Sequence, residues 1–327
     1  MSELLCDIHG RDISYLRVSL TEKCNFQCQY CSIDGESNAV TESELTSDEL
    51  ITVLEAMATL GVNKIRLTGG EPMLRPDIVE LVRRISAIKG NRLIGLTTNG
   101  FLLARKLPEL LDAGLNRLNI SLDSINRENF HKITKRDGLQ NVLNAIDIAE
   151  QSGAFNWVKV NVVVIRGVNL NELNDFAKWA LPRKIDLRFI EYMPAQSIGW
   201  GSERHVGEEE VREKIQFELT GDTRNSDIQG PARRYRVDGY PGRISFISAI
   251  SHSFCRMCNR LRLLSNGELV GCLFHSNSID LRSQLRSGST QSEVVKTIKT
   301  AVKDSEFRII PDVKGIDYQP AMGTIGG

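Results

Sequence analysis

Strand-like runs alternate with helical patterns over the first two thirds of this 327-residue chain. The strand-like runs occupy residues 15–20, 64–68, 93–97, 117–122, 158–165 and 186–191. Amphipathic segments lie between them at residues 47–60, 76–89, 102–113, 139–152 and 171–181, with glycine or proline at their ends. Strands joined by helices in this way predict a parallel sheet with right-handed crossovers, either doubly wound or curled into a barrel.

Polar or glycine-rich clusters follow five of the six predicted strands. They are the cysteine-containing residues 24–31, the Gly-Gly-Glu-Pro run at 69–72, and residues 97–100, 121–123 and 191–194. In a parallel barrel the carboxyl ends of the strands form one face, and that face carries the active site. Any one cluster fits an ordinary turn, but five of them on the same face predict a functional site there.

The pattern changes after about Pro194. Residues 208–217 fit a polar helix, residues 235–237 and 244–247 fit the two strands of a hairpin, and short helical segments come near the C-terminus. We therefore expect two domains, residues 1–195 and residues 196–327.

The charges of the chain balance as a whole but not locally. Lysine and arginine total 41, and so do aspartate and glutamate, which argues against general binding of nucleic acid. Residues 231–262 nevertheless carry seven arginines against one acid, Asp238. Arginine is suited to bind phosphate, although a solvated hairpin face would explain the same residues. Because the sequence lacks a P-loop and a G-x-G-x-x-G fingerprint, a bound nucleotide would need side chains from several strand ends.

The sequence shows no apolar run long enough to span a membrane, and its N-terminus lacks the hydrophobic core of a signal peptide. We therefore expect a cytoplasmic protein. In that compartment thiols stay reduced, and clustered cysteines bind metal more often than they form disulfides.

The seven cysteines form two triads and one leftover. Cys24, Cys28 and Cys31 have the spacing C-x3-C-x2-C, and Cys255, Cys258 and Cys272 have the spacing C-x2-C-x13-C. Each triad has one thiolate fewer than a closed metal site usually takes, which leaves a position open for a substrate. Cys6 has no cysteine at ligand spacing and fits a free thiol.

Spacing alone leaves two kinds of site open for the first triad. One is a four-iron cluster with one open iron, and the other is a zinc site completed by water or another residue. Zinc sites usually pair C-x2-C units, so the three-residue gap favours iron and sulfur.

The run CNFQCQYC, with an aromatic residue before its last cysteine, and the later GGEP together resemble the radical S-adenosylmethionine (AdoMet) enzymes. The resemblance implies an incomplete (β/α)6 barrel of the TIM type over residues 1–195. It also implies that Cys24, Cys28 and Cys31 hold a [4Fe–4S] cluster whose fourth iron is chelated by AdoMet. An electron from that cluster would break the sulfonium C–S bond and yield a 5′-deoxyadenosyl radical.

The same resemblance assigns AdoMet contacts to four residues. Gly70 would let the backbone approach the methionine amino group, and Ser121 would contact the carboxylate or the ribose. Tyr30 and Met193 would contact the adenine side. Taken alone, Ser121 also fits a turn-capping hydroxyl and Met193 a filler of the core.

The C-terminal part resembles one branch of these enzymes, the GTP 3′,8-cyclases of molybdenum cofactor biosynthesis. The resemblance is carried by the second triad with R-x-R inside it, the runs KVNVVVIRGVN and RFIEYM, and the terminal Gly-Gly. It implies that residues 196–327 form an α+β molybdenum-cofactor-synthesis domain. There Cys255, Cys258 and Cys272 would hold a second [4Fe–4S] cluster whose open iron touches the guanine of GTP.

The resemblance also implies a set of GTP-binding residues: Arg17, Arg66, Thr97, Lys159, Arg260, Leu261 and Arg262. A charge inside a barrel is costly unless it meets an anion, which favours a phosphate contact for the three cations on predicted strands. For Arg260 and Arg262 a solvated face is a stronger alternative than for the other cations, but the local excess of arginine favours phosphate. Arg17 and the tail residues Gly326 and Gly327 are the expected catalytic residues, although a glycine tail also fits a frayed terminus.

The implied reaction removes the hydrogen from C3′ of GTP, joins C3′ to C8 of guanine, and adds one electron and one proton. Its product is (8S)-3′,8-cyclo-7,8-dihydroguanosine 5′-triphosphate. The expected partners are a flavodoxin- or ferredoxin-like electron donor and a downstream cyclic pyranopterin monophosphate synthase, with a homodimer allowed and neither membrane nor nucleic acid bound. The alternatives are a peptide-modifying radical AdoMet enzyme with an auxiliary cluster, and a non-catalytic metal-binding protein that contacts RNA.

Overall fold

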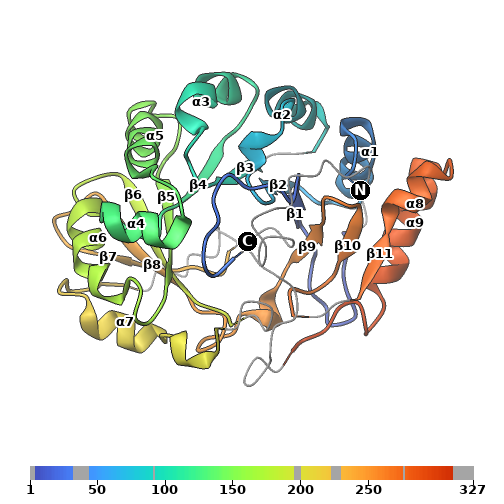
Figure 1. The fold of residues 1–327 in the computed structure, drawn as a ribbon. Helices are drawn as coiled ribbons and strands as arrows, with labels where there is room; N and C mark the ends of the chain where they lie inside the picture. The colour runs from blue at the N-terminus through green and yellow to red at the C-terminus, as the bar shows by residue number, and fades with distance from the viewer. Residues whose placement is uncertain are drawn as a thin grey trace.

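One sheet of eleven strands runs through the described chain in the order β11-β10-β9-β1-β2-β3-β4-β5-β6-β8-β7 (Figure 1). The computed structural model describes residues 4–31, 44–90, 93–194, 200–221, 230–274 and 277–311. The central six strands are mutually parallel: β1 (Tyr15–Ser19), β2 (Lys64–Thr68), β3 (Leu93–Thr98), β4 (Arg117–Ser121), β5 (Val158–Val164) and β6 (Ile185–Glu191). Each lies within one residue of its predicted bounds, and the expected α/β class with a partial barrel is confirmed.

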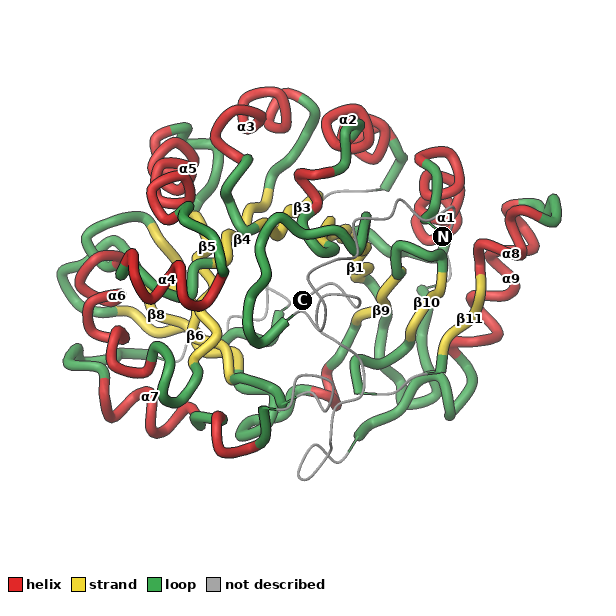
Figure 2. The backbone as a smooth tube through the Cα atoms, viewed as in Figure 1, coloured by secondary structure: helices red, strands yellow, loops and turns green. Residues whose placement is uncertain are grey.

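Helices cover the outer face of this curved sheet (Figure 2). They are α1 (Ser47–Thr59), α2 (Ile78–Ala87), α3 (Leu103–Asp112), α5 (Leu139–Gln151) and α6 (Leu173–Ala180). The first begins at a capping box in which Thr46 and Glu49 satisfy each other's backbone N–H groups. The sequence analysis missed α4 (Arg127–Thr134), a polar helix capped by Asn126.

Side chains along the strands alternate between the helix layer and the barrel interior, because successive residues of a strand point to opposite faces. In β1, Leu16 and Val18 are fully buried in the apolar core, whereas Tyr15 and Arg17 lie on the other face. The alternation in β5 places Val158, Val160, Val162 and Val164 in the core and the residues between them inside the barrel. The core therefore lies between sheet and helices, and the polar strand residues are left to line the interior.

Strands of the C-terminal third extend both edges of the six-stranded sheet. At one edge β9 (Arg260–Leu263) runs parallel to β1, and β10 (Glu268–Val270) and β11 (Ser278–Asp280) continue it antiparallel. At the other edge β8 (Arg243–Ile247) runs parallel to β6 and forms the predicted hairpin with β7 (Arg233–Arg236). The described residues after β6 also form three α-helices: α7 (Glu208–Lys214), α8 (Leu281–Arg286) and α9 (Gln291–Val302). The division into two domains at residue 195 stays a prediction.

Candidate active site

The loop of the first triad follows β1 and is fixed by α4. The backbone N–H groups of Gln27 and Gln29 donate to carbonyl groups of the last turn of that helix, at 2.9 and 3.1 Å. Phe26 packs edge-on against Phe101 and Phe130, with ring centroids 5.9 and 5.7 Å apart. These contacts anchor the middle of the loop, while Cys24 is exposed and Cys28 and Cys31 are half-buried.

The thiols of this loop lie close enough to affect each other's ionisation. Burial and the neighbouring Cys24 and Asp123 raise the pKa of Cys31 to about 12. Burial also raises the pKa of Cys28, and the Cys31 thiol adds to the effect. Ionising such thiols together requires added positive charge nearby, which a bound metal centre supplies. The donor set therefore fits an iron–sulfur cluster held by three thiolates.

The GGEP run at residues 69–72, which follows β2, forms hydrogen bonds with the start of the cysteine loop after β1 and with the end of β3. Gly70 donates its N–H to the Thr21 carbonyl at 2.7 Å, and a Cβ on Gly70 would lie only 2.1 Å from the Lys23 carbonyl oxygen. A side chain therefore has no room there, because the start of the cysteine loop packs directly on this residue. This contact is a structural reason for the glycine that the sequence analysis did not foresee.

The buried Glu71 side chain completes this junction. Its carboxylate accepts hydrogen bonds from Thr98 Oγ1 at 2.6 Å, from the Asn99 N–H at 2.7 Å and from the Met73 N–H at 3.0 Å. Burial raises the pKa of Glu71 to about 7. Asn99 in turn donates through Nδ2 to Asn25 Oδ1 at 2.7 Å and lies 3.9 Å from Cys24 Sγ.

The structure places the four expected AdoMet residues on strand ends and on the cysteine loop. Tyr30 donates its hydroxyl to Asp123 Oδ2 at 2.5 Å, directly after β4. Ser121 ends β4, in register with Asn161 of β5, and Met193 follows β6 half-buried. Asp123 was not predicted as part of the site, although it stands in the cluster at residues 121–123 that follows the fourth predicted strand.

Basic side chains gather inside the barrel on neighbouring strands. We define the cation cluster as Arg17, Lys64, Arg66, Lys159, Arg260 and Arg262. Arg17 lies in register with Arg66 on one side and with Arg262 on the other. Arg66 donates through Nε to the Tyr15 hydroxyl at 3.0 Å, and Lys64 Nζ lies 4.3 Å from the centre of the same ring.

Burial and mutual repulsion disfavour the charged forms of the cation cluster, and a bound anion would favour them. Burial, reinforced by Arg262, lowers the pKa of Arg17 to about 9. Burial, reinforced by Arg188 and Arg66, lowers the pKa of Lys159 to about 6. Because buried like charges disfavour each other's charged forms, this interior is suited to a multiply charged anion.

Two basic residues of this interior were not predicted as ligands, and period-two alternation along predicted strands would have found them. Lys64 shares a face of β2 with Arg66, and Arg188 shares a face of β6 with Asp186. Arg188 pairs with that aspartate at 2.6 Å. Burial also lowers the pKa of Lys64 to about 8.

Polar groups on the inner face of β3, β4 and β5 also fit a ligand. Thr97 Oγ1, Asn119 Oδ1 and Asn161 Oδ1 are buried and have no hydrogen-bond partner in the described part of the chain. Thr97 and Asn119 are register partners on adjacent strands. Buried polar atoms are rarely left without partners, so these three are candidates to bind hydroxyl or amine groups of a substrate.

The second triad lines one cavity together with arginines. Its walls are made by all three cysteines and by Arg11, Ala249, Phe254, Arg260, Arg262, Gly271, Leu273, Phe274, Arg308, Ile309 and Pro311. Burial opposes ionisation of Cys258, yet the guanidinium groups of Arg260 and Arg308 hold the pKa of this thiol below its usual value. Three thiols that line one cavity beside cations fit a negatively charged cluster.

Four residues that the sequence analysis singled out remain: Leu261, Gly326, Gly327 and Cys6. Leu261 is fully buried on the opposite face of β9 from Arg260 and Arg262, so only its backbone is available to a substrate. Gly326 and Gly327 lie outside the described residues. Cys6 forms an isolated bridge with Asp12 and joins neither triad.

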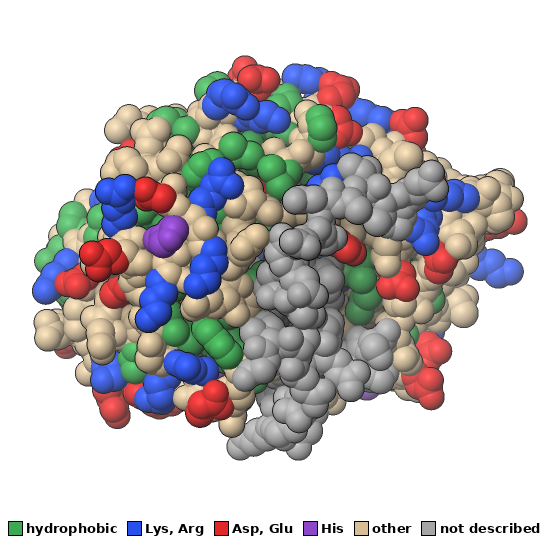
Figure 3. Space-filling model, in the orientation of Figure 1, with side chains coloured by type: hydrophobic (Ala, Val, Ile, Leu, Met, Phe, Trp, Pro, Cys, Tyr) green, Lys and Arg blue, Asp and Glu red, His purple; other side chains and the backbone are tan. Residues whose placement is uncertain are grey.

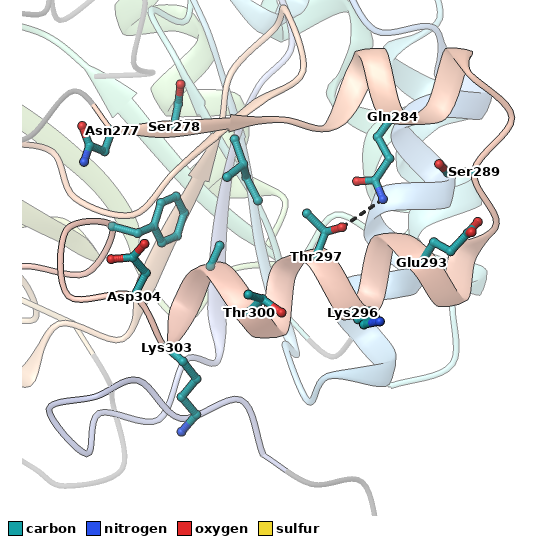
Figure 4. Close-up of a pocket in the computed structure, with 13 residues that line it drawn as sticks. Asn277, Ser278, Gln284, Ser289, Glu293, Lys296, Thr297, Thr300, Lys303 and Asp304 are labelled. Atoms are coloured by element: carbon teal, nitrogen blue, oxygen red, sulfur yellow. Dashed lines mark hydrogen bonds between the residues drawn. The ribbon is translucent and has the colours of Figure 1, made fainter.

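One hollow on the described surface carries no predicted site residue. A hollow between β11, α8 and α9 is lined by Ile279, Gln284, Thr297 and their neighbours, with a hydrogen bond of 2.9 Å from Gln284 to Thr297 (Figure 4). On the visible face, acidic and basic side chains are interspersed (Figure 3). In the described ranges, no three His, Cys, Asp or Glu side chains converge as ligands of a single ion, and no helix has the length and hydropathy needed to cross a bilayer.

Both halves of the chain match families of known proteins. Residues 18–180 match the Radical SAM superfamily, and residues 185–309 match the family Molybdenum Cofactor Synthesis C. The GTP 3′,8-cyclase of Thermodesulfovibrio yellowstonii is 39% identical over 325 residues, which cover 98% of this chain and 99% of that protein. The chain belongs to the GTP 3′,8-cyclase family of radical SAM enzymes.

Other members of the GTP 3′,8-cyclase family differ in length. The enzyme of Pseudomonas putida is 42% identical over 312 residues, 93% of this chain and 91% of that protein. Molybdenum cofactor biosynthesis protein 1 of Mus musculus is 42% identical over 303 residues, 92% of this chain but 48% of that protein. The chain thus spans about half the length of several curated relatives. Streptococcus suis SuiB shares the fold, with a TM-score of 0.61 over 90% of this chain and 67% of that chain at 14% identity.

Membership of the GTP 3′,8-cyclase family bears on the alternatives that the sequence left open. As a radical SAM enzyme the chain uses a [4Fe–4S] cluster and AdoMet. The family match favours the cyclase over a peptide-modifying enzyme and over a non-catalytic RNA-binding protein.

Proposed function

We propose that this chain converts GTP to (8S)-3′,8-cyclo-7,8-dihydroguanosine 5′-triphosphate. The observation that carries the proposal is the cation cluster inside the barrel, on strands β9, β1, β2 and β5. The first triad follows β1 along the chain, and Arg260 and Arg262 of the cluster line the cavity of the second triad. Burying several like charges close together is costly, and a bound triphosphate would offset part of that cost. The relatives named GTP 3′,8-cyclase support the same substrate.

At one end of the site, Cys24, Cys28 and Cys31 would hold the [4Fe–4S] cluster, which when bound supplies the electron that cleaves AdoMet. Gly70 keeps the strand end close to the cysteine loop, and Tyr30 is held by Asp123 at the β4 end. Together with Ser121 and Met193, these residues would orient AdoMet across the carboxyl ends of the strands.

At the other end, Cys255, Cys258 and Cys272 would hold a second [4Fe–4S] cluster, which when bound offers an open iron to the guanine. Arg17, Arg66, Lys159, Arg260 and Arg262 would bind the triphosphate, and we add Lys64 and Arg188 to this set. Thr97, Asn119 and Asn161 would use their unpartnered oxygens to bind ribose or base donors.

The protein's contribution to the reaction is positioning. A triphosphate held by the cation cluster would leave the ribose free to lie between the two triads, where the AdoMet-derived radical could reach it. A bound substrate that fills this interior would keep water away from reactive intermediates. Gly326 and Gly327, which lie outside the described residues, stay predicted catalytic residues of the tail.

The wider context also belongs to this proposal. We expect a flavodoxin- or ferredoxin-like electron donor and a cyclic pyranopterin monophosphate synthase that consumes the product. A homodimer, a cytoplasmic location and a domain boundary at residue 195 are likewise predictions. The free cysteines support a reducing compartment.

Anaerobic incubation with AdoMet, dithionite and GTP tests the proposal directly. We expect 5′-deoxyadenosine and the cyclised nucleotide to form together, as measured by liquid chromatography and mass spectrometry. Arg17→Met should abolish the nucleotide product while both clusters remain, and the exposed Arg105→Met serves as the matched control. Formation of 5′-deoxyadenosine without consumption of GTP would overturn the proposed substrate.

A further inference from the structure

Two buried arginines lie behind the second triad and share one carboxylate. Arg11 donates through Nε to Asp7 Oδ2 at 2.7 Å, and Arg308 donates through Nε to the same oxygen at 3.1 Å. The side chains of Asp7, Arg11 and Arg308 are exposed by 0%, 6% and 2% respectively. Buried charges are costly unless they are paired and fully hydrogen-bonded, so the remaining donors of both guanidinium groups must also be used.

Those remaining donors bind the backbone of the second triad. Arg11 Nη1 donates to the Cys255 carbonyl at 2.8 Å, and Arg308 Nη2 donates to the Cys258 carbonyl at 2.9 Å. Arg308 Nη1 donates to the carbonyl of Gly271, the residue that precedes Cys272. Each cysteine of the triad is therefore fixed through its own carbonyl or that of the residue before it.

The approach of Arg308 to the triad is enforced by packing. A Cβ on Gly271 would lie 2.0 Å from the carbonyl oxygen of Phe307, so the chain before Arg308 rests directly on that glycine. Arg308 Nη1 also donates to the Arg260 carbonyl at 2.8 Å, and His9 Nε2 lies 2.8 Å from the carbonyl oxygen of Arg308. Segments from both ends of the described chain thus meet at the wall of the cysteine cavity.

We propose that Asp7, Arg11 and Arg308 form a clamp that holds the second triad in the geometry of its cluster and sets the cluster's reduction potential. The clamp residues are positioning residues, and the inference rests on the proposed second cluster. Two guanidinium groups against one carboxylate leave one net positive charge behind the cysteines. A positive charge beside an iron–sulfur cluster stabilises the reduced, more negative state and so raises the reduction potential.

The clamp makes two separable predictions, one for geometry and one for charge. Arg308→Lys keeps the charge but removes the planar fork that reaches two carbonyl groups at once, so the second cluster should be bound less completely. Asp7→Asn keeps the shape of the acid but removes its charge, so the potential of the second cluster should shift to a more positive value. Arg308→Met removes the fork and the charge, so any second cluster that it retains should shift to a more negative value.

The experiment uses the full chain purified without oxygen, with iron and sulfide counted and each cluster followed by potentiometric electron paramagnetic resonance. We expect about eight irons in the unmodified protein and about four in Arg308→Met. Arg75→Met is the matched control, because Arg75 donates to the Leu20 and Leu45 carbonyls, each at 3.3 Å, and pairs with Asp77 at 2.8 Å, away from the second triad. This control should keep about eight irons.

The outcomes separate the clamp from the function on which it rests. About four irons in the unmodified protein would overturn the second cluster and, with it, the clamp. About eight irons in both the unmodified protein and Arg308→Met, with equal potentials, would overturn the clamp alone. If Arg308→Met does not fold, Asp7→Asn decides: a merely structural ion pair predicts an unchanged potential, and the clamp predicts the positive shift.

Discussion

Replacing Lys159 with methionine should make the protein more stable while it weakens GTP binding. Lys159 lies on the inner face of β5, and burial together with Arg188 and Arg66 lowers its pKa from 10.5 to about 6. At pH 7 the unfolded chain therefore carries a proton on this amine that the folded chain does not. The lysine thus opposes folding at pH 7, whereas a bound anion would favour its charged form.

The size of this effect follows from proton linkage. The pKa of 10.5 lies 3.5 pH units above pH 7, and at about 1.4 kcal/mol per pH unit the penalty has an upper limit of about 5 kcal/mol. Because the side chain is partly exposed, water reduces this value, and we expect Lys159→Met to add about 1–3 kcal/mol to the free energy of unfolding. A folded-state pKa below the unfolded one makes the penalty largest below pH 6 and absent above pH 10.5. The gain should therefore shrink between pH 7 and pH 9.

Thermal unfolding of the anaerobically purified protein measures this prediction, with the exposed Lys184→Met as the control. We expect a melting temperature a few degrees higher for Lys159→Met at pH 7 and a smaller difference at pH 9. Calorimetry in two buffers should also show that GTP binding takes up a proton in the unmodified protein and less in the variant. A variant that is no more stable, or a gain independent of pH, would refute the reasoning.

Three further predictions test the other parts of the site. Gly70→Ala should displace the cysteine loop, because its Cβ meets the Lys23 carbonyl oxygen, and iron analysis should show loss of the first cluster with retention of the second. Tyr30→Phe removes the hydrogen bond to Asp123 and should cost about 1 kcal/mol in unfolding free energy and weaken AdoMet binding; unchanged affinity would place Tyr30 outside the AdoMet site. Deleting Gly326 and Gly327 should leave both clusters intact and abolish the cyclised product in an anaerobic turnover assay.

Local patterns predicted the central strands and most of the helices, because the signals for these elements, alternating apolar residues and a glycine at the end, lie within the element itself or next to it. They missed α4, whose sequence RENFHKIT is mostly polar and gives a weak apolar stripe. That helix matters to the site, since its last turn fixes the loop of the first triad. The sequence pattern would also have allowed Lys64 and Arg188 to be predicted as interior residues, because alternation along β2 and β6 places both inside the barrel.

Contacts between distant segments lay beyond sequence reasoning. The four-residue strand β9 pairs with β1 across more than two hundred residues, and nothing in RLRL specifies that neighbour. The same holds for the bonds of Arg308 to Asp7 and to the Cys258 carbonyl. These pairings depend on the complete fold, so the sequence predicted the cysteines of the second triad but not what holds them.

The position of β9 beside β1 has a consequence for how the protein is made. During synthesis the first six parallel strands emerge long before residues 260–263, and until then the outer edge of β1 lacks the strand that later covers it. An uncovered strand edge pairs readily with other chains, and pairing over such a long separation is slow to form. The edge of β1 in the six-stranded barrel is therefore exposed to aggregation while residues 192–259 are being made. Chains that stop before β9 should depend on chaperones far more than full-length chains do.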